Sequence, residues 1–126
     1  MTEPITPAAP VETADRVRLA VRAALDTKAE DVRVRYVAEV AGFTDYFVFA
    51  SAANERQVQA IADRIEERLR EAGVRPLSIE GHAAAQWVLL DYGDWIAHVF
   101  LDERRRFYGL ERLWNDAPDV TPDFVP

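Results

Sequence analysis

The residues that could do chemistry gather between positions 87 and 100, in the stretch WVLLDYGDWIAHVF. Asp91 and His98 are residue types that activate a nucleophile or hold a metal ion. Such a pair needs a nucleophile or a metal beside it. The chain has no cysteine, and no serine stands in a G-x-S-x-G pattern. We therefore expect a hydrogen-bonded histidine, in the fold or at an interface, and no catalytic site.

Metal and phosphate sites are not expected either. His82 and His98 are the only histidines, and their spacing fits no metal-ligand motif. The five glycines show neither G-x-G nor G-x-x-x-x-G-K spacing, so no cofactor is predicted. Arg104, Arg105 and Arg106 could bind an anion, but three adjacent arginines cannot all face one way. At least one of them should be structural or solvated.

Composition and charge narrow the function further. The chain has 126 residues, of which 49% are hydrophobic and 29% charged, as expected for one globular domain. A formal net charge of −7 argues against binding DNA through its phosphates. No apolar run reaches the roughly 20 residues that span a bilayer. The first ten residues do not resemble a secretory signal, so a cytoplasmic protein is expected.

An acidic zone directly precedes the three arginines. Between positions 76 and 103 there is no lysine or arginine, and the acids are Glu80, Asp91, Asp94, Asp102 and Glu103. This arrangement is compatible with a charged protein partner. A solvated surface is the plainer interpretation, and charge alone favours it.

Hydrophobic periodicity predicts a single α/β domain over residues 13–115. Residues 1–12 and 116–126 are rich in proline and acids, and both are expected to be disordered. Helices are predicted at 13–27, capped by Thr13, at 54–72 and at about 105–114. For the 54–72 helix, Asn54 and Gln57 have the spacing of an N-terminal cap, and Gly73 stands where a C-terminal glycine cap belongs. Strands are predicted at 32–37, 46–50, 75–80 and in the two arms of 87–100. The result is a five-stranded mixed sheet in which the strands flanking the 54–72 helix are parallel and the helices cover mainly one face.

The stretch 87–100 is predicted to be a hairpin with a Gly93-Asp94 turn. Strand alternation then puts an apolar set on one face: Val88, Leu90, Tyr92, Trp95, Ala97 and Val99. The other face carries a mixed set: Trp87, Leu89, Asp91, Ile96, His98 and Phe100. Because the helices are expected on the apolar side, the mixed face is predicted to be open. Large apolar groups beside an aspartate and a histidine are typical of a protein-binding surface.

The segment RRFYGLERLW is predicted to be helical, which would put Tyr108, Glu111 and Arg112 on one face. Trp114 is expected to lie in the core rather than at a contact.

Taken together, the motifs resemble the ribosomal silencing factor family (the RsfS/Iojap group). They are TDYFVFASAANERQVQAIAD, IEG, WVLLDYGDWIAHVF and RRFYGLERLW, and the resemblance covers about residues 13–114. It implies a fold related to nucleotidyltransferases, but the Gly-Ser turn and D-x-[DE] pair of those enzymes are missing. It also implies a homodimer without catalysis. Such a protein binds the fourteenth protein of the large ribosomal subunit, blocks joining of the small subunit and represses translation when nutrients are scarce.

The resemblance also carries over to individual positions. The residues that it implies for the ribosomal contact are Trp87, Asp91, His98, Tyr108 and Glu111. The other motif positions are Asp45, Tyr46, Glu80, Gly81, Gly93, Asp94, Arg105 and Trp114. The chain departs from the family pattern at Ala52, where glycine is usual, and at Trp95, where an aliphatic residue is usual. The alternative is a nucleotide-binding or residual nucleotidyltransferase-like protein, which the missing acids disfavour.

Overall fold

The structure is a computed structural model that describes residues 12–126, without the side chains of Phe107 and Leu113. The prediction of a disordered N-terminal segment therefore falls, except for its last residue, outside the described part of the chain. Within that part, no helix combines the length and the apolar character that a bilayer crossing requires.

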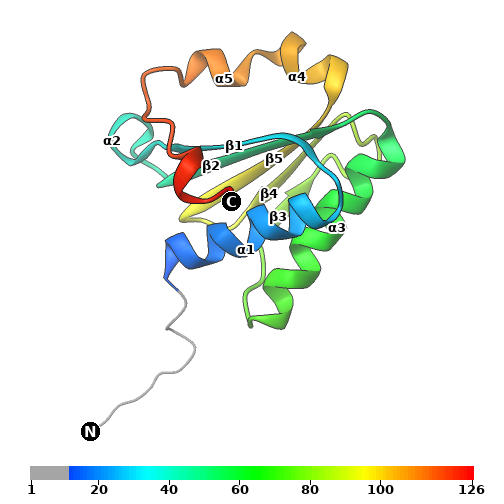
Figure 1. The fold of residues 1–126 in the computed structure, drawn as a ribbon, viewed down its shortest axis with the longest axis horizontal. Helices are drawn as coiled ribbons and strands as arrows, with labels where there is room; N and C mark the ends of the chain where they lie inside the picture. The colour runs from blue at the N-terminus through cyan, green and yellow to red at the C-terminus, as the bar shows by residue number, and fades with distance from the viewer. Residues whose placement is uncertain (1–11) are drawn as a thin grey trace, which may run out of the picture.

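Five strands form one mixed sheet in the order β1-β2-β5-β4-β3 (Figure 1). Their bounds are Glu30–Tyr36 (β1), Tyr46–Ala52 (β2), Ser78–Glu80 (β3), Trp87–Asp91 (β4) and Trp95–Leu101 (β5). β2 and β5 are parallel, and every other neighbouring pair is antiparallel. β3 thus runs in the direction of β2, as the crossover predicts, with β5 and β4 between them. The predicted five-stranded mixed sheet is confirmed.

Two long helices, α1 (Thr13–Asp26) and α3 (Glu55–Glu71), lie side by side on one face of the sheet (Figure 1). Asn54 caps the start of α3, as predicted, because its side chain accepts the backbone N–H of Gln57 at 2.9 Å. The Gln57 side chain donates to the carbonyl groups of Thr27 and Lys28, so it ties α3 to the end of α1.

Gly73, with φ +81°, ends α3 in the left-handed conformation, as predicted. The predicted Thr13 cap is wrong. α1 begins after Glu12 without a side-chain cap, and the Thr13 hydroxyl donates to Asp94 at 3.3 Å.

The hairpin register is the predicted one. Trp87 is paired with Phe100, Leu89 with His98, and Asp91 with Ile96, and the Tyr92 N–H donates to the Trp95 carbonyl at 3.0 Å. The predicted apolar face packs into the core beneath α1 and α3, with Trp95 fully buried and stacked on Tyr92 at 4.3 Å. Strand alternation therefore assigned both faces of the hairpin correctly.

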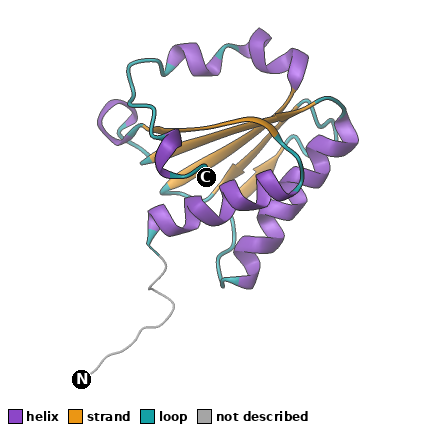
Figure 2. Cartoon of the chain, viewed as in Figure 1, coloured by secondary structure: helices purple, strands orange, loops and turns teal. Residues whose placement is uncertain are grey.

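The prediction that the second face is open is wrong for β5. Figure 2 shows helices on this side of the sheet as well. They are α4 (Asp102–Tyr108) and α5 (Leu110–Leu113), and we call residues 102–114 the strap. Under the strap, a second core cluster contains Phe47, Phe49, Ile96 and Phe100, with Leu110 and Trp114 packed against it. On β2 and β5 these apolar residues alternate with the residues that face α1 and α3. Both faces of the two strands are therefore apolar and have to be buried.

Two further segments differ from expectation. The turn after β1 contains a short helix, α2 (Ala38–Ala41), which ends at Gly42. The prediction that residues 116–126 lie outside the fold is wrong. The Pro118 carbonyl accepts the Tyr36 N–H at 3.0 Å, the Val120 N–H donates to Val34 at 2.9 Å, and a 3₁₀ turn follows at Thr121–Asp123. This segment satisfies backbone groups on the outer edge of β1, which explains its order.

Candidate functional site

Trp87 is the centre of an aromatic cluster that joins the hairpin to the strap. Its ring lies 4.8 Å from Tyr108 on α4 and 5.4 Å from Phe100 on β5. Its indole N–H donates to Nδ1 of His98 at 3.1 Å. Trp87 is half-buried and Tyr108 is 40% exposed, whereas Phe100 is fully buried. The cluster therefore has a buried base and an outward side formed by Trp87 and Tyr108.

His98 belongs to the buried base of the cluster. It is only 4% exposed and stacks on Phe49 at 5.3 Å, with Phe47 edge-on at 5.0 Å. Burial lowers the pKa of His98 to about 3, so the ring is neutral near pH 7. Because Nδ1 accepts the Trp87 N–H, the proton lies on Nε2, which has no hydrogen-bond partner among the described residues.

Asp91 and His98 do not form a pair. They are diagonal neighbours in the register, but Asp91 accepts the N–H of Gly93 at 2.8 Å and His98 accepts from Trp87. Asp91 thereby stabilises the hairpin turn, where Gly93 has φ +87°. Asp94 in the same turn accepts the Asp45 N–H at its carbonyl, at 2.8 Å. The motif positions Asp91, Gly93 and Asp94 therefore belong to one turn, and the Asp91 carboxylate bonds within that turn rather than to His98.

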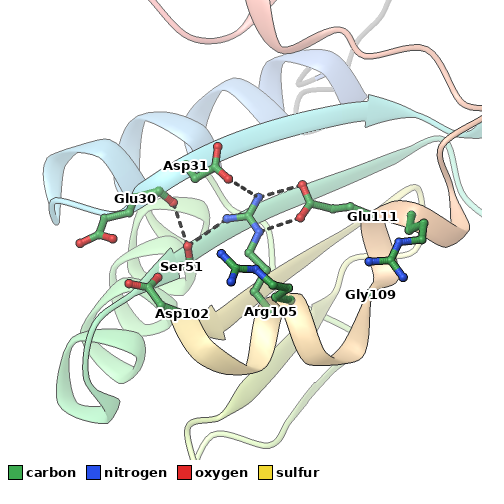
Figure 3. A pocket seen from close by; sticks show the side chains of 9 residues that line it. Glu30, Asp31, Ser51, Asp102, Arg105, Gly109 and Glu111 are labelled. Atoms are coloured by element: carbon green, nitrogen blue, oxygen red, sulfur yellow. Dashed lines mark hydrogen bonds and ion pairs between the residues drawn. The ribbon is translucent and has the colours of Figure 1, made fainter.

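Arg105 is a structural member of the arginine run, in agreement with the expectation that at least one would be (Figure 3). Its Nε and Nη2 donate to the two carboxylate oxygens of Glu111 at 2.8 and 2.9 Å, and Nη1 donates to the Ser51 hydroxyl at 2.9 Å. Asp31 lies 3.5 Å from Nη2. The side chain is 8% exposed, and a two-pronged carboxylate bond is the geometry that suits a desolvated guanidinium.

Gly109 makes the Arg105–Glu111 pairing possible. It has φ +63°, which ends α4 and starts α5, so Glu111 turns back towards Arg105. The prediction that Tyr108, Glu111 and Arg112 share one continuous helix face is therefore wrong.

Figure 3 shows a surface pocket around Arg105. Its lining contains four acids and three arginines: Glu30, Asp31, Asp102 and Glu111 with Arg105, Arg106 and Arg112. A hydrogen bond and repulsion between the Glu30 and Asp102 carboxyl groups raise the pKa of Glu30. Four carboxyl groups make the pocket a poor match for a triphosphate. Among residues 12–126, no cluster of three or more His, Cys, Asp or Glu side chains could hold a metal ion.

The remaining motif positions have structural partners. Gly81, with φ +80°, lets the loop after Glu80 approach the backbone of Trp87, where a Cβ atom would collide with the Trp87 carbonyl. Tyr46 packs edge-on against Tyr36 at 5.2 Å, and burial raises its pKa. Trp114 packs against Phe47 at 5.2 Å, in agreement with its predicted place in the core.

Sequence reasoning missed two of the partners of Arg105. Ser51 is a lone hydroxyl near the end of a fully buried strand segment, and such an isolated polar group usually has a specific partner. Asp31 adopts φ +49°, which is uncommon outside glycine, and no sequence pattern indicated it.

Fold and site together define a small α/β domain that presents an aromatic surface and whose polar motif residues are mostly engaged with one another. A comparison with known families identifies it further. The family model described as "Ribosomal silencing factor during starvation" matches residues 10–126.

Individual relatives agree with this match. "Ribosomal silencing factor RsfS" of Halalkalibacterium halodurans is 40% identical over 104 residues, which cover 82% of this chain and 89% of that protein. Its counterpart in Bacillus subtilis is 38% identical over 108 residues, covering 86% and 92%. A crystal structure of a Chromobacterium violaceum protein superposes with a TM-score of 0.81 at 34% identity, covering 82% of this chain and 87% of that one. The chain belongs to the RsfS family of ribosomal silencing factors, and the predicted resemblance is confirmed.

Proposed function

We propose that this protein is a non-enzymatic ribosomal silencing factor. It binds the large ribosomal subunit through the fourteenth protein of that subunit, blocks association with the small subunit and represses translation under nutrient limitation. Membership of the RsfS family supports this proposal.

The observation that carries the proposed contact is the outward side of the Trp87–Tyr108 pair. Two aromatic rings 4.8 Å apart, one of them 40% exposed, form the kind of rigid anchor that dominates protein interfaces. Asp91 lies on the same face of β4 as Trp87, because the two are four residues apart in a strand. Its side chain is half-buried. An aromatic anchor beside a carboxylate suits a basic partner such as a ribosomal protein.

The five proposed contact residues differ in their exposure and in their bonds. Trp87, Asp91 and Tyr108 reach the surface, and His98 is buried. Glu111 is distinguished by its bonds rather than by burial, since its side chain is 32% exposed but both carboxylate oxygens bind Arg105. The first three are therefore suited to touch a partner. His98 supports the indole of Trp87 from below, since it accepts its N–H.

The test is co-sedimentation with purified large subunits. Trp87→Ala should abolish it while the protein stays folded, because truncating an aromatic anchor typically costs about 2 kcal/mol or more. Leu77→Ala is the matched control, since Leu77 is 75% exposed and lies before β3. Undiminished binding by a folded Trp87→Ala protein would refute this surface, and failure of the unaltered protein to bind would refute the function.

We further propose that the protein acts in the cytoplasm as a homodimer, as the family resemblance implies. Sedimentation equilibrium would test the dimer, and a single species of 14.3 kDa across the micromolar range would refute it.

A nucleotide-binding role is the weaker candidate. The pocket beside Ser51 is its only structural support among the described residues, and four carboxyl groups line that pocket. Calorimetry with nucleoside triphosphates and Mg²⁺ should therefore show no binding, and clear micromolar binding would revive this candidate.

A further inference from the structure

We propose that Arg105 and Glu111 form a positioning device that places Tyr108 against Trp87, and that Glu111 acts through Arg105 rather than by touching the partner. This inference rests on the proposed function and assigns roles within the same site. It separates residues that contact the ribosome from residues that hold those contacts in place.

Three chain segments meet at the Arg105 guanidinium. Its guanidinium binds Glu111 on α5, the Ser51 hydroxyl on β2 and the Asp31 carboxylate on β1. Ser51 in turn donates to the Glu30 carbonyl at 3.2 Å. A single side chain of α4 therefore fastens the strap to the ends of two strands.

Arg105 and Tyr108 lie close together on α4. The two residues are three positions apart on one short helix, so a rotation or shift of α4 that releases Arg105 also moves Tyr108. Tyr108 contacts the hairpin through its ring, 4.8 Å from Trp87 and 6.0 Å from Phe100. Ring contacts of this kind are weakly directional, whereas the bonds of Arg105 to Glu111 and Ser51 are directional and constrain the position of the helix.

Glu111 is bound by Arg105 through its whole carboxylate group. Both of its carboxylate oxygens accept from Arg105, at 2.8 and 2.9 Å. A basic partner that bound Glu111 would have to compete with Arg105, whose side chain is 8% exposed. Arg105 would then lose its main counterion while it stayed buried. Glu111 thus stabilises Arg105, and the surface offered to the partner is that of Trp87 and Tyr108.

The first experiment needs no ribosome. Nuclear Overhauser contacts between the Tyr108 ring and the Trp87 indole would be measured in the unaltered protein, in Arg105→Gln and in Glu103→Gln. Glu103 is an exposed acid on the same helix and serves as the control. The contacts should weaken or vanish in Arg105→Gln and persist in Glu103→Gln. Unchanged contacts in Arg105→Gln would overturn the proposal.

The second experiment is a double-mutant cycle on affinity for large subunits, with Arg105→Gln, Glu111→Gln and the double variant. Each single variant should bind roughly tenfold more weakly, the scale of one moderate anchor contact. The double variant should bind no more weakly than the weaker single variant, because both changes disable one device. It also removes both charges of the buried pair together, which favours its folding.

Additive losses, giving roughly a hundredfold decrease in the double variant, would make Glu111 a direct contact and overturn the proposal. If the unaltered protein does not bind large subunits, the proposed function fails, and the ring contacts still decide whether Arg105 places Tyr108.

Discussion

The indole N–H of Trp87 donates a hydrogen bond of 3.1 Å to Nδ1 of His98, across the antiparallel pair β4 and β5. The two residues are diagonal neighbours on the sheet face under the strap. This bond requires a neutral histidine with its proton on Nε2. It links the half-buried anchor of the proposed ribosomal contact to a side chain that is only 4% exposed.

The burial of His98 predicts a specific loss of stability in mild acid. Burial lowers its pKa from 6.5 to about 3, so the unfolded chain takes up this proton more readily than the folded one. Stability from this group is complete above pH 6.5 and decreases as the pH falls towards the folded pKa. The slope should be about 1.4 kcal/mol per pH unit below 6.5. Urea denaturation down to about pH 5, before carboxylates titrate strongly, measures it.

Histidine variants provide the controls for that measurement. His98→Gln keeps an acceptor for Trp87 but cannot titrate, so the slope should disappear. His82→Gln should retain it, because His82 is a partly exposed histidine paired with Asp63. A pH-independent stability of the unaltered protein over this window would contradict a buried neutral His98.

Tyr108→Ala should weaken binding to large subunits by roughly tenfold to thirtyfold, the effect of losing one aromatic anchor. Tyr108 is 40% exposed but also packs against Trp87 and Phe100, so the melting temperature should fall modestly, in line with a loss of about 1 kcal/mol. Tyr108→Phe keeps the ring and should retain most of the affinity. Equal binding by the alanine variant, measured by sedimentation with purified subunits, would remove Tyr108 from the contact.

Gly81→Ala should destabilise the fold by about 2–4 kcal/mol for two reasons. The new methyl group collides with the Trp87 carbonyl, and the alanine must adopt an unfavourable φ of +80°. Gly73→Ala is the matched comparison. It has φ +81° with nothing within 4 Å, so it should cost about 1 kcal/mol for the backbone conformation alone. Equal losses in urea denaturation would show that the approach to Trp87 does not matter.

The C-terminal segment should contribute measurably to stability. The Thr121 hydroxyl accepts the buried Val34 N–H at 2.9 Å, and Thr121→Val leaves this donor without a partner. The expected cost is about 1–3 kcal/mol in the free energy of unfolding. Asp123→Asn, an exposed change in the same turn, should have little effect. Equal melting temperatures for Thr121→Val and the unaltered protein would mean that the segment is not docked in solution.

The Thr121 variant has a second readout. Hydrogen bonds from the Thr121 hydroxyl and N–H lower the pKa of Asp119. In Thr121→Val the hydroxyl bond is lost, so the pKa of Asp119 should rise towards its ordinary value. A carboxyl titration followed by NMR would record this change.

Sequence patterns predicted the parts of the fold that follow from periodicity. Alternation assigned Trp95 and Trp87 to opposite faces, and the cap signals placed Asn54 and Gly73 at the two ends of α3. These features depend on local geometry, which neighbouring residues determine.

The errors concern contacts between residues far apart in the chain. The tail 116–126 resembles a disordered segment by composition, yet its backbone binds the edge of β1 more than 80 positions earlier, as in the hydrogen bond between Thr121 and Val34. The burial of His98 on β5 depends on rings from two other strands, Phe47 and Phe49 on β2 and Trp87 on β4. A family motif marks such residues without distinguishing a buried support from a surface contact.

The parallel pairing of β2 with β5 has a consequence for how the chain is made. Residues 46–52 pair with residues 95–101, so the inner edge of β2 lacks its neighbour until the last strand of the sheet has been synthesised. Before then β2 can pair only with β1, and its apolar sequence YFVFASA keeps a bare edge prone to aggregation. A chain that stalls short of Leu101 is therefore a client for chaperones and proteases rather than a smaller working domain.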